Sequence, residues 1–404
     1  MISGSLKHLT SSPVTKDFIM NTLTQLPPLS LYIHLPWCIQ KCPYCDFNSH
    51  SIQQNTLNET AYIQALINDL QTELPNIWGR SINSIFIGGG TPSLFQAASI
   101  DKLMSHIRAL VKLSPQAEIT LEANPGTFER EKFQGFKEAG INRLSIGVQS
   151  FQDKQLHAIG RVHNSQEAKR AIEYALNIFE RVNIDLMYAL PEQTIQAATQ
   201  DIQTAISLGV PHISAYQLTL EPNTAFGHTP PNHLPSDELS QDIEEAVHQT
   251  LFQAAYQRYE ISAFTKTAHQ QSQHNLNYWQ FGDYIGIGAG AHGKISYATH
   301  IERTTRTRSP KDYLTAMHNN PTQAITRQNI ATKDLPAEFM MNALRLTDGV
   351  PSQSFTERTG ISLAQIAKPL TLATQKKLLD KDPRFLRPTA LGQRFLNDLI
   401  ELFL

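Results

Sequence analysis

The chain has 404 residues, with 34 Lys plus Arg against 36 Asp plus Glu and a formal net charge of -2 at pH 7. At roughly 100 to 200 residues per domain, this length predicts two or three domains, or one large α/β domain with an appendage. The balance of charges argues against a nucleic-acid binder that works through a broad basic surface. No segment has the apolar pattern of a secretory signal or of a membrane span, so we expect a cytoplasmic protein with no integral membrane segment.

The first 29 residues read as an N-terminal extension, and six β-rich runs alternate with amphipathic segments after it. Strand and helix alternation of this kind predicts an α/β fold with a parallel sheet. The predicted strands are Leu29–Leu35, Ser84–Gly88, Glu118–Ala123, Arg143–Gln149, Val182–Ala189 and His212–Leu220. Residues 30–222 are therefore predicted to form the core domain.

The chain changes character after residue 222. Residues 221–235 are rich in turn formers and read as a linker, and a helix is predicted from about Asp237 to Tyr259. Residues 223–300 are predicted to complete the core domain. Residues 301–404 are predicted to form an α-rich domain, with a winged-helix-like unit at its end.

All three cysteines lie in one short run, Cys38, Cys42 and Cys45, with the spacing C-x3-C-x2-C. A tight loop of this spacing can turn three thiolates toward one centre, and three are too few to close a structural zinc site. Iron–sulfur clusters are held by Cys thiolates, normally four, so three would leave one iron open. The alternatives are a zinc site completed by His34 or His50, or three unliganded thiols.

Glycines and polar residues close the runs that follow. GGGTPS ends the second run at residues 88–93, EANP the third at 122–125 and GVQS the fourth at 147–150. Asp185 lies inside the otherwise apolar fifth run, where a charge is costly unless it is paired. Functional residues of parallel sheets gather at the C-terminal ends of the strands, so we expect one site there.

The cysteine spacing after a strand that ends in YIHLPWC, residues 32–38, resembles the radical S-adenosylmethionine (SAM) superfamily. The resemblance implies a partial (β/α)6 TIM-like barrel and a [4Fe-4S] cluster held by the three cysteines, with SAM on the fourth iron. Carried over by position, the residues expected around SAM are Tyr32, Tyr44, Gly89, Gly90, Thr91, Glu122, Gln149, Arg161 and Asp185. Taken singly, each of these could equally be a structural hydrogen-bond partner or a helix cap.

Within that superfamily, RLSIGVQSF at residues 143–151 and NIDLMYALP at 183–191 resemble the oxygen-independent coproporphyrinogen III oxidases and the related HemW heme chaperones. The oxidases carry a fourth cysteine in the motif, where this chain has Phe47, and a longer N-terminal extension. The resemblance therefore implies a heme chaperone with heme and a heme-acceptor protein as partners, and it leaves a homodimer open. The alternative is an oxidase that acts on coproporphyrinogen III through a 5'-deoxyadenosyl radical.

HNLNYW, residues 274–279, matches a motif implicated in heme binding in the chaperones. The residues that this implies are His274, Asn275, Tyr278 and Trp279. Imidazole is a natural axial ligand of heme iron, and aromatic neighbours suit a porphyrin face. The residues alone favour a plainer interpretation, a surface helix cap in a histidine-rich stretch. A further departure from the family pattern is Glu192 in LPEQT, where glycine is usual, and it is expected to place a charge beside the SAM site.

Overall fold

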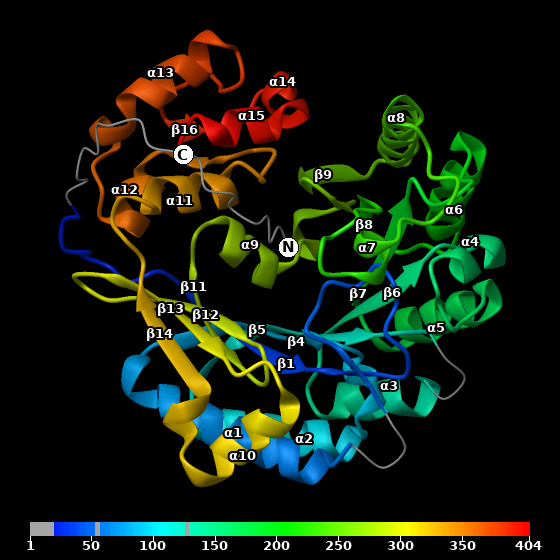
Figure 1. The fold of residues 1–404 in the computed structure, drawn as a ribbon, viewed down its shortest axis with the longest axis horizontal. Coiled ribbons are helices and arrows are strands. Elements are labelled where there is room, and N and C mark those ends of the chain that lie inside the picture. Colours follow the sequence, from blue (N-terminus) through cyan, green and yellow to red (C-terminus); the bar gives the residue numbers. More distant parts are fainter. Residues whose placement is uncertain (1–19, 53–56, 126–128) are drawn as a thin grey trace.

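The computed structural model describes residues 20–52, 57–125 and 129–404, and Figure 1 shows its fold. Most of the predicted N-terminal extension lies outside these ranges. The six predicted strands all form and lie side by side in chain order, each parallel to the next. They are β1 (Leu29–Leu35), β4 (Ser81–Gly89), β5 (Lys112–Ala123), β6 (Arg143–Gln149), β7 (Arg181–Tyr188) and β8 (His212–Gln217).

Helices follow these strands and cover the outer face of the sheet, as expected for βα units (Figure 1). They are α1 (Glu59–Glu73), α2 (Ala97–Leu110), α3 (Glu129–Glu138), α4 (Asp153–Ala158), α5 (Ser165–Ile178) and α6 (Ile195–Ser207). Side-chain caps begin several of them. Asn164 accepts from the amide of Glu167 while the Glu167 carboxylate accepts from the amide of Asn164, which is a complete capping box.

Further strands extend the sheet at both edges. Beside β1 lies β11 (Asp283–Ile287), which is parallel to it, followed by the antiparallel strands β12 (His292–Ser296), β13 (Ile301–Arg306) and β14 (Ile325–Asn329). Beside β8 lie β10 (Ala263–Thr265) and β9 (Gln257–Glu260). The edge strands β14 and β9 do not pair with each other, so the barrel is open.

The barrel strands alternate between apolar side chains that face the helices and polar side chains that face the lumen. On β1, Leu31 and Ile33 are fully buried in the main core, while Tyr32 and His34 face inward and hydrogen-bond each other. The register fixes which lumen residues are neighbours: Ser30 pairs with Ser84, and Arg143 pairs with Arg181. The lumen is therefore polar and lined in layers, and the hydrophobic core lies outside the sheet.

Four predicted boundaries are wrong by three residues or more. Strand β4 begins three residues earlier than expected, at Ser81, and β5 begins six residues earlier, at Lys112. The helix expected to reach Tyr259 is α8 (Asp237–Gln253), which ends where Ala255 takes a positive φ of 64° and turns the chain into β9. The apolar spacing continues across this turn, because Tyr256 and Tyr259 are buried by strand packing and not by a helix face. The sixth strand ends at Gln217, three residues earlier than expected. The predicted linker contains one short helix, α7 (Ala225–His228).

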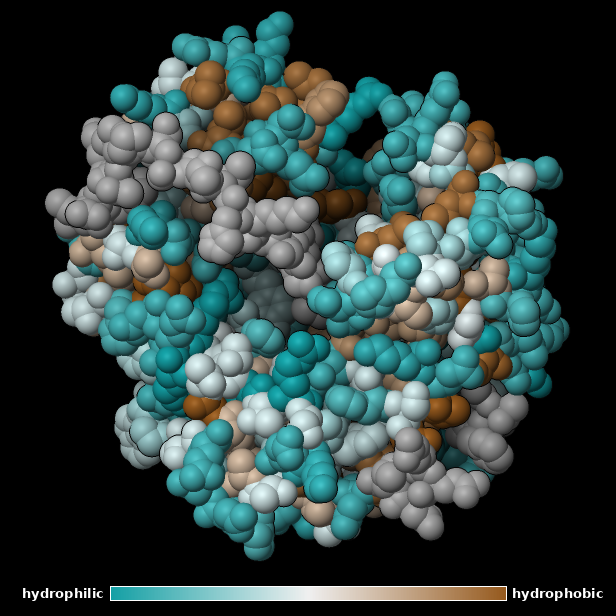
Figure 2. Space-filling model, viewed as in Figure 1, coloured by the Kyte–Doolittle hydropathy of each residue, from teal (hydrophilic) through white to brown (hydrophobic). Residues whose placement is uncertain are grey.

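The C-terminal region forms a second hydrophobic core, around Phe339 and Phe355. It is helical as predicted, with a small antiparallel pair formed by β15 (Val350–Pro351) and β16 (Phe385–Leu386). Figure 2 shows apolar side chains gathered over this region around α13. The remaining helices are α9 (Gln273–Trp279), α10 (Pro310–Asn319), α11 (Leu335–Ala343), α12 (Gln353–Thr359), α13 (Ala367–Gln375), α14 (Ala390–Arg394) and α15 (Leu396–Glu401).

Candidate cofactor and heme sites at opposite ends of the barrel

The cysteine loop lies at the C-terminal end of β1. A turn closed by a hydrogen bond from the amide of Cys45 to the carbonyl of Cys42, at 3.1 Å, brings the second and third thiols to one side of the loop. Burial raises the pKa of Cys38 and of Cys45, and the other two thiols raise the pKa of Cys38 further. The three sulfurs are therefore close enough to act on one another. Binding to a metal would deprotonate them.

Arg161 joins this loop to two strand ends. Its Nη1 donates to Cys42 Sγ at 3.6 Å, while its Nη2 donates to Asn124 Oδ1 at 2.8 Å and to the carbonyl of Gly147 at 2.5 Å. Asn124 in turn donates to Thr91 Oγ1 at 2.8 Å. The Thr91 hydroxyl lies close enough to Cys38 to lower the pKa of its thiol. One chain of contacts thus runs from Cys42 toward Cys38 through Arg161 and through Asn124 and Thr91, two residues predicted at different strand ends.

The glycine-rich end of β4 packs tightly against its neighbours. Gly89 has a φ of 116°, which side chains disfavour, and a Cβ there would come within 2.5 Å of the His34 ring. The Gly89 amide donates to Glu122 Oε2 at 3.0 Å, and the Gly90 amide donates to the carbonyl of Leu35. Close backbone packing is therefore sufficient to explain these glycines, whether or not they also contact a ligand.

Two carboxyl groups from different strands meet in the lumen near the C-terminal ends of the strands, which we call the upper end. Burial and, to a lesser extent, the nearby Asp185 carboxyl raise the pKa of Glu122 to about 8, against the hydrogen bond from the Gly89 amide. Burial also raises the pKa of Asp185, against hydrogen bonds from Asn183, Ser214 and Ser145. Asn183 Nδ2 donates to Asp185 Oδ1 at 2.9 Å. Asp185 in β7 is thus surrounded mainly by neutral hydrogen-bond donors, and Glu122 keeps its proton near neutral pH.

Three further predicted SAM residues, Gln149, Tyr44 and Tyr32, lie at the same end of the barrel. Gln149 has a positive φ of 70° at a register shift in β6, and its Oε1 accepts from the Tyr216 hydroxyl at 2.9 Å. Such backbone strain in a non-glycine residue is typical of functional sites. Tyr44 packs against the small apolar cluster around Met187. Tyr32 stacks on Phe86 with ring centroids 6.4 Å apart.

Glu192 is placed differently from the sequence-based expectation. Its exposed side chain pairs with Lys154 at 2.5 Å on the surface, so it adds no charge to the lumen. Its φ of 56° explains why the family pattern has glycine at this position.

The zinc alternative lacks a preformed site in the part of the chain that the structure describes. No three His, Cys, Asp or Glu side chains there are grouped to hold a single metal ion. His34 is already engaged, since Nδ1 contacts the Tyr32 hydroxyl and Nε2 contacts the carbonyl of Asn48, each at 2.9 Å. A cluster makes a different demand, because its thiolates bind separate irons.

The predicted heme motif lies at the other end of the barrel. Helix α9 covers the N-terminal ends of the strands, and His274 is buried in it, 1% exposed. Its Nδ1 contacts Ser84 Oγ at 3.0 Å, and its Nε2 contacts the Tyr278 hydroxyl at 2.9 Å. Five residues of β4 separate Ser84 from Gly89, so the two ends lie roughly 16 Å apart along the strand.

The other motif residues point in different directions. Tyr278 packs edge-on against His274 and Tyr284. Trp279 packs against the C-terminal core, with the Arg345 guanidinium 4.2 Å from its ring centroid. Asn275 is partly exposed on the helix. The structure thus brings His274 and Tyr278 together, and the Trp279 ring lies edge-on to Tyr278, with centroids 6.5 Å apart, while it packs on the C-terminal core. The surface helix cap favoured by the residues alone does not describe a buried His274.

Sequence reasoning missed a set of titratable residues beneath α9, which we call the floor cluster and define as Glu118, Arg143, Arg181 and His212. Three of them are the first residues of β6, β7 and β8, and Glu118 lies two residues before the β5 partner of Arg143. Glu118 pairs with Arg181 at 2.6 Å and accepts from the amides of Gln273 and His274. The sequence signal for this cluster is a basic residue at the first position of each of three successive strands, β6, β7 and β8.

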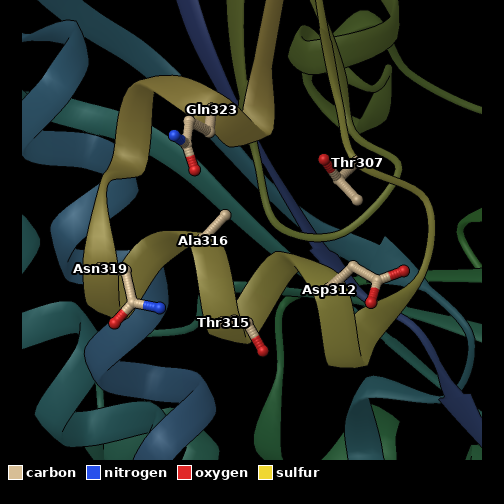
Figure 3. A pocket seen from close by; sticks show the side chains of 6 residues that line it. All are labelled: Thr307, Asp312, Thr315, Ala316, Asn319 and Gln323. Atoms are coloured by element: carbon tan, nitrogen blue, oxygen red, sulfur yellow. The ribbon is translucent and has the colours of Figure 1, made fainter.

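A surface cavity of about 270 Å³ lies between α10 and the short helix of residues 321–324, as Figure 3 shows. None of the predicted site residues lines this cavity, and Asp312 is the one charged residue among the six that do. Thr307, Thr315, Ala316, Asn319 and Gln323 complete the lining.

Comparison with known proteins places this geometry in a family. Residues 32–205 match the family model of the radical SAM superfamily, and residues 330–395 match that of the HemN C-terminal domain. A protein of Haemophilus influenzae named heme chaperone HemW is 47% identical over 388 residues, which is 95% of this chain and 99% of that protein. The chain belongs to the HemW family. The Escherichia coli protein of the same name is 46% identical over 95% of this chain and 100% of its own length.

The fold has a solved counterpart. Coproporphyrinogen III oxidase (HemN) of Escherichia coli, described as a radical SAM enzyme, superposes with a TM-score of 0.79 over 94% of this chain and 90% of that one. At 23% identity this likeness concerns the fold, and it confirms the open α/β barrel with a helical C-terminal region. Among the described residues, none of the helices is both long and apolar enough to cross a membrane.

Proposed function

We propose that this protein is a heme chaperone, which binds heme and delivers it to an acceptor protein in the cytoplasm. The observation that carries the proposal is the identity of 46% and 47% with two proteins named heme chaperone HemW, over almost the full length of all three chains. A shared length of this extent includes the floor of the barrel and α9 as well as the cysteine loop.

The upper site fits an iron–sulfur cluster and SAM. Cys38, Cys42 and Cys45 would hold the cluster, which supplies an open iron for SAM and an electron for its cleavage. Arg161 Nε is buried and has no hydrogen-bond partner in the described chain, which suits the SAM carboxylate. Glu122, protonated near neutral pH, offers a carboxyl group that a bound ammonium would ionise.

The site at the N-terminal ends of the strands, which we call the lower site, contains a histidine that is suited to bind heme iron. Burial lowers the pKa of His274 to about 3, so its imidazole stays neutral, which is the form that binds iron. The Ser84 hydroxyl holds Nδ1 and thereby fixes the ring orientation. Heme iron would replace the Tyr278 hydroxyl at Nε2 after α9 shifts from its place.

The test is a heme titration followed at the Soret band. The wild-type protein is expected to bind heme, and His274→Ala is expected to lose the shift of an imidazole-ligated heme. His269→Ala is the matched control, because His269 lies five residues earlier and is exposed. An unchanged titration in His274→Ala would show that the ligand lies elsewhere, with His292 as the next candidate.

The oxidase alternative is separated by an assay of product. Phe47 stands where the oxidase pattern has its fourth cysteine. We therefore expect no protoporphyrinogen IX after anaerobic incubation of the reconstituted protein with SAM, a reductant and coproporphyrinogen III. Clean conversion would contradict a function restricted to heme transfer.

A further inference from the structure

The floor cluster contains more buried cationic groups than anionic ones. Arg143 and Arg181 are direct partners across the β6–β7 register, so their Cα atoms are about 4.8 Å apart. Glu118 forms its ion pair with Arg181, and within the described ranges no carboxylate forms one with Arg143. Arg143 is nevertheless buried, 2% exposed. A buried charge is costly unless it is paired, so an unpaired guanidinium here calls for an explanation.

The neighbours of Arg143 do not supply the missing charge. Burial, together with the adjacent Arg181, lowers the pKa of Arg143, while Glu118, Tyr259 and Asp185 oppose this shift without forming an ion pair with it. His212 is kept neutral, because burial and the two arginines lower its pKa. The Tyr259 hydroxyl is hydrogen-bonded to His212 Nε2 at 2.9 Å. Burial raises the pKa of this phenol, so Tyr259 carries no charge either.

Backbone carbonyls occupy the two guanidinium groups in this structure. Arg143 Nη1 donates to the carbonyl of Gln270 at 2.8 Å, and Arg181 Nη2 donates to the carbonyl of Gln271 at 2.9 Å. Arg181 Nε is buried without a hydrogen-bond partner in the described chain. Two consecutive carbonyls thus stand where two oxygens of an anion would be held, immediately before α9.

From this arrangement we infer that Arg143 and Arg181 form a carboxylate-binding subsite, which takes a propionate group of the porphyrin when the Gln270–Gln271 segment gives way. The inference rests on the proposed function, and it assigns the propionate end of heme to residues outside the HNLNYW motif. Paired guanidinium forks match the two oxygens of a carboxylate better than single carbonyls do. The same shift that frees His274 Nε2 would also free both arginines, because Glu118 and the two arginines hold the same segment.

SAM carries a carboxylate too, and the position of the subsite argues against it. Arg143 begins β6, whereas Gly147 and Gln149 near the cofactor residues close that strand. Four residues of strand correspond to roughly 13 Å. Arg161, at the cysteine loop, is the arginine placed for the SAM carboxylate.

The experiment compares hemin with hemin dimethyl ester, whose propionates carry no charge, in the full-length protein. The wild type is expected to bind hemin about 10- to 100-fold more tightly than the ester, the range that charge-assisted hydrogen bonds supply. Arg143→Gln and Arg181→Gln are each expected to remove most of this preference. Arg384→Gln is the control, because it makes the same chemical change on an arginine whose side chain is 79% exposed.

The outcomes separate this inference from the proposed function. Failure of the wild type to bind hemin at all would contradict both. Equal binding of hemin and ester by the wild type would contradict the subsite and leave the chaperone function standing. A preference that persists in both arginine variants would also contradict the subsite, provided that they retain the wild-type iron content. Weakened SAM binding with unchanged hemin binding in Arg143→Gln would assign the subsite to SAM instead. If neither variant folds, the wild-type comparison of the two ligands still decides.

Discussion

The two ends of the barrel solve different problems with the same strands. At the C-terminal end, side chains from separate loops converge on the cysteines, and the Asp185 carboxyl lies close enough to Glu122 to raise its pKa. At the N-terminal end, Glu118 and Arg181 form a buried ion pair and α9 covers it. One end thus places two neighbouring carboxyl groups in the lumen, and the other places two arginines and one carboxylate beneath α9. The difference teaches that the residues proposed for the cofactors and those proposed for heme lie at separate ends of one polar lumen.

The loss of one thiol should break the upper end alone. Cys42→Ala is expected to abolish the [4Fe-4S] absorbance of reconstituted protein, because a cluster held by three thiolates loses a third of its protein ligands. Iron and sulfide analysis measures this directly. Ser49→Ala is the control, since Ser49 contacts Cys45 Sγ at 3.6 Å without being a ligand by motif. A full cluster in Cys42→Ala would refute the assignment.

The lower end should respond most strongly to the loss of Glu118. Glu118→Gln leaves two buried guanidinium groups without their carboxylate and weakens the cap of α9, so unfolding should become easier by roughly 3 to 5 kcal/mol. Urea denaturation measures the change. Glu338→Gln is the matched control, because its pair with Arg303 is partly exposed and should be worth about 0 to 1 kcal/mol. Equal losses in the two variants would show that the floor cluster carries no special cost.

Glu122 predicts a dependence of stability on pH. Its pKa is about 8 in the folded protein and near the ordinary 4.5 when unfolded, so the folded state holds a proton that the unfolded state has released between these values. The free energy of unfolding of the cluster-free protein should therefore fall as pH rises from about 5 to 8. Glu122→Gln should remove this pH dependence. Relative to the wild type, the free energy of unfolding of the variant should rise by about 1 to 3 kcal/mol between pH 5 and pH 8. Parallel pH curves for the two proteins would contradict the shift.

The smallest effect is expected at Glu192. Replacement by glycine relieves a positive φ but adds freedom to the unfolded chain, and these two contributions nearly cancel. We expect the midpoint of thermal unfolding to change by less than about 3 °C and SAM binding to stay the same, because the side chain lies at the surface. A large change in SAM affinity would place Glu192 in the upper site after all.

The sequence predicted the upper end better than the lower one for a physical reason. In a parallel sheet the loops after the strands meet at one edge, so C-x3-C-x2-C, GGGTPS and Asp185 could be assigned to one site from order alone. The floor depends on which alternate residues face the lumen and on what covers them. Arg143 and Arg181 look like ordinary strand starts, and the burial of His274 follows only once α9 is placed against Ser84.

The most direct test of two separate ends is a side-by-side measurement of iron content and heme titration in Cys42→Ala and His274→Ala. The account predicts that Cys42→Ala loses the cluster and still binds heme through an imidazole. It predicts that His274→Ala keeps the cluster and loses the imidazole-ligated heme spectrum. Loss of both properties in either variant, with the protein still folded, would contradict the separation.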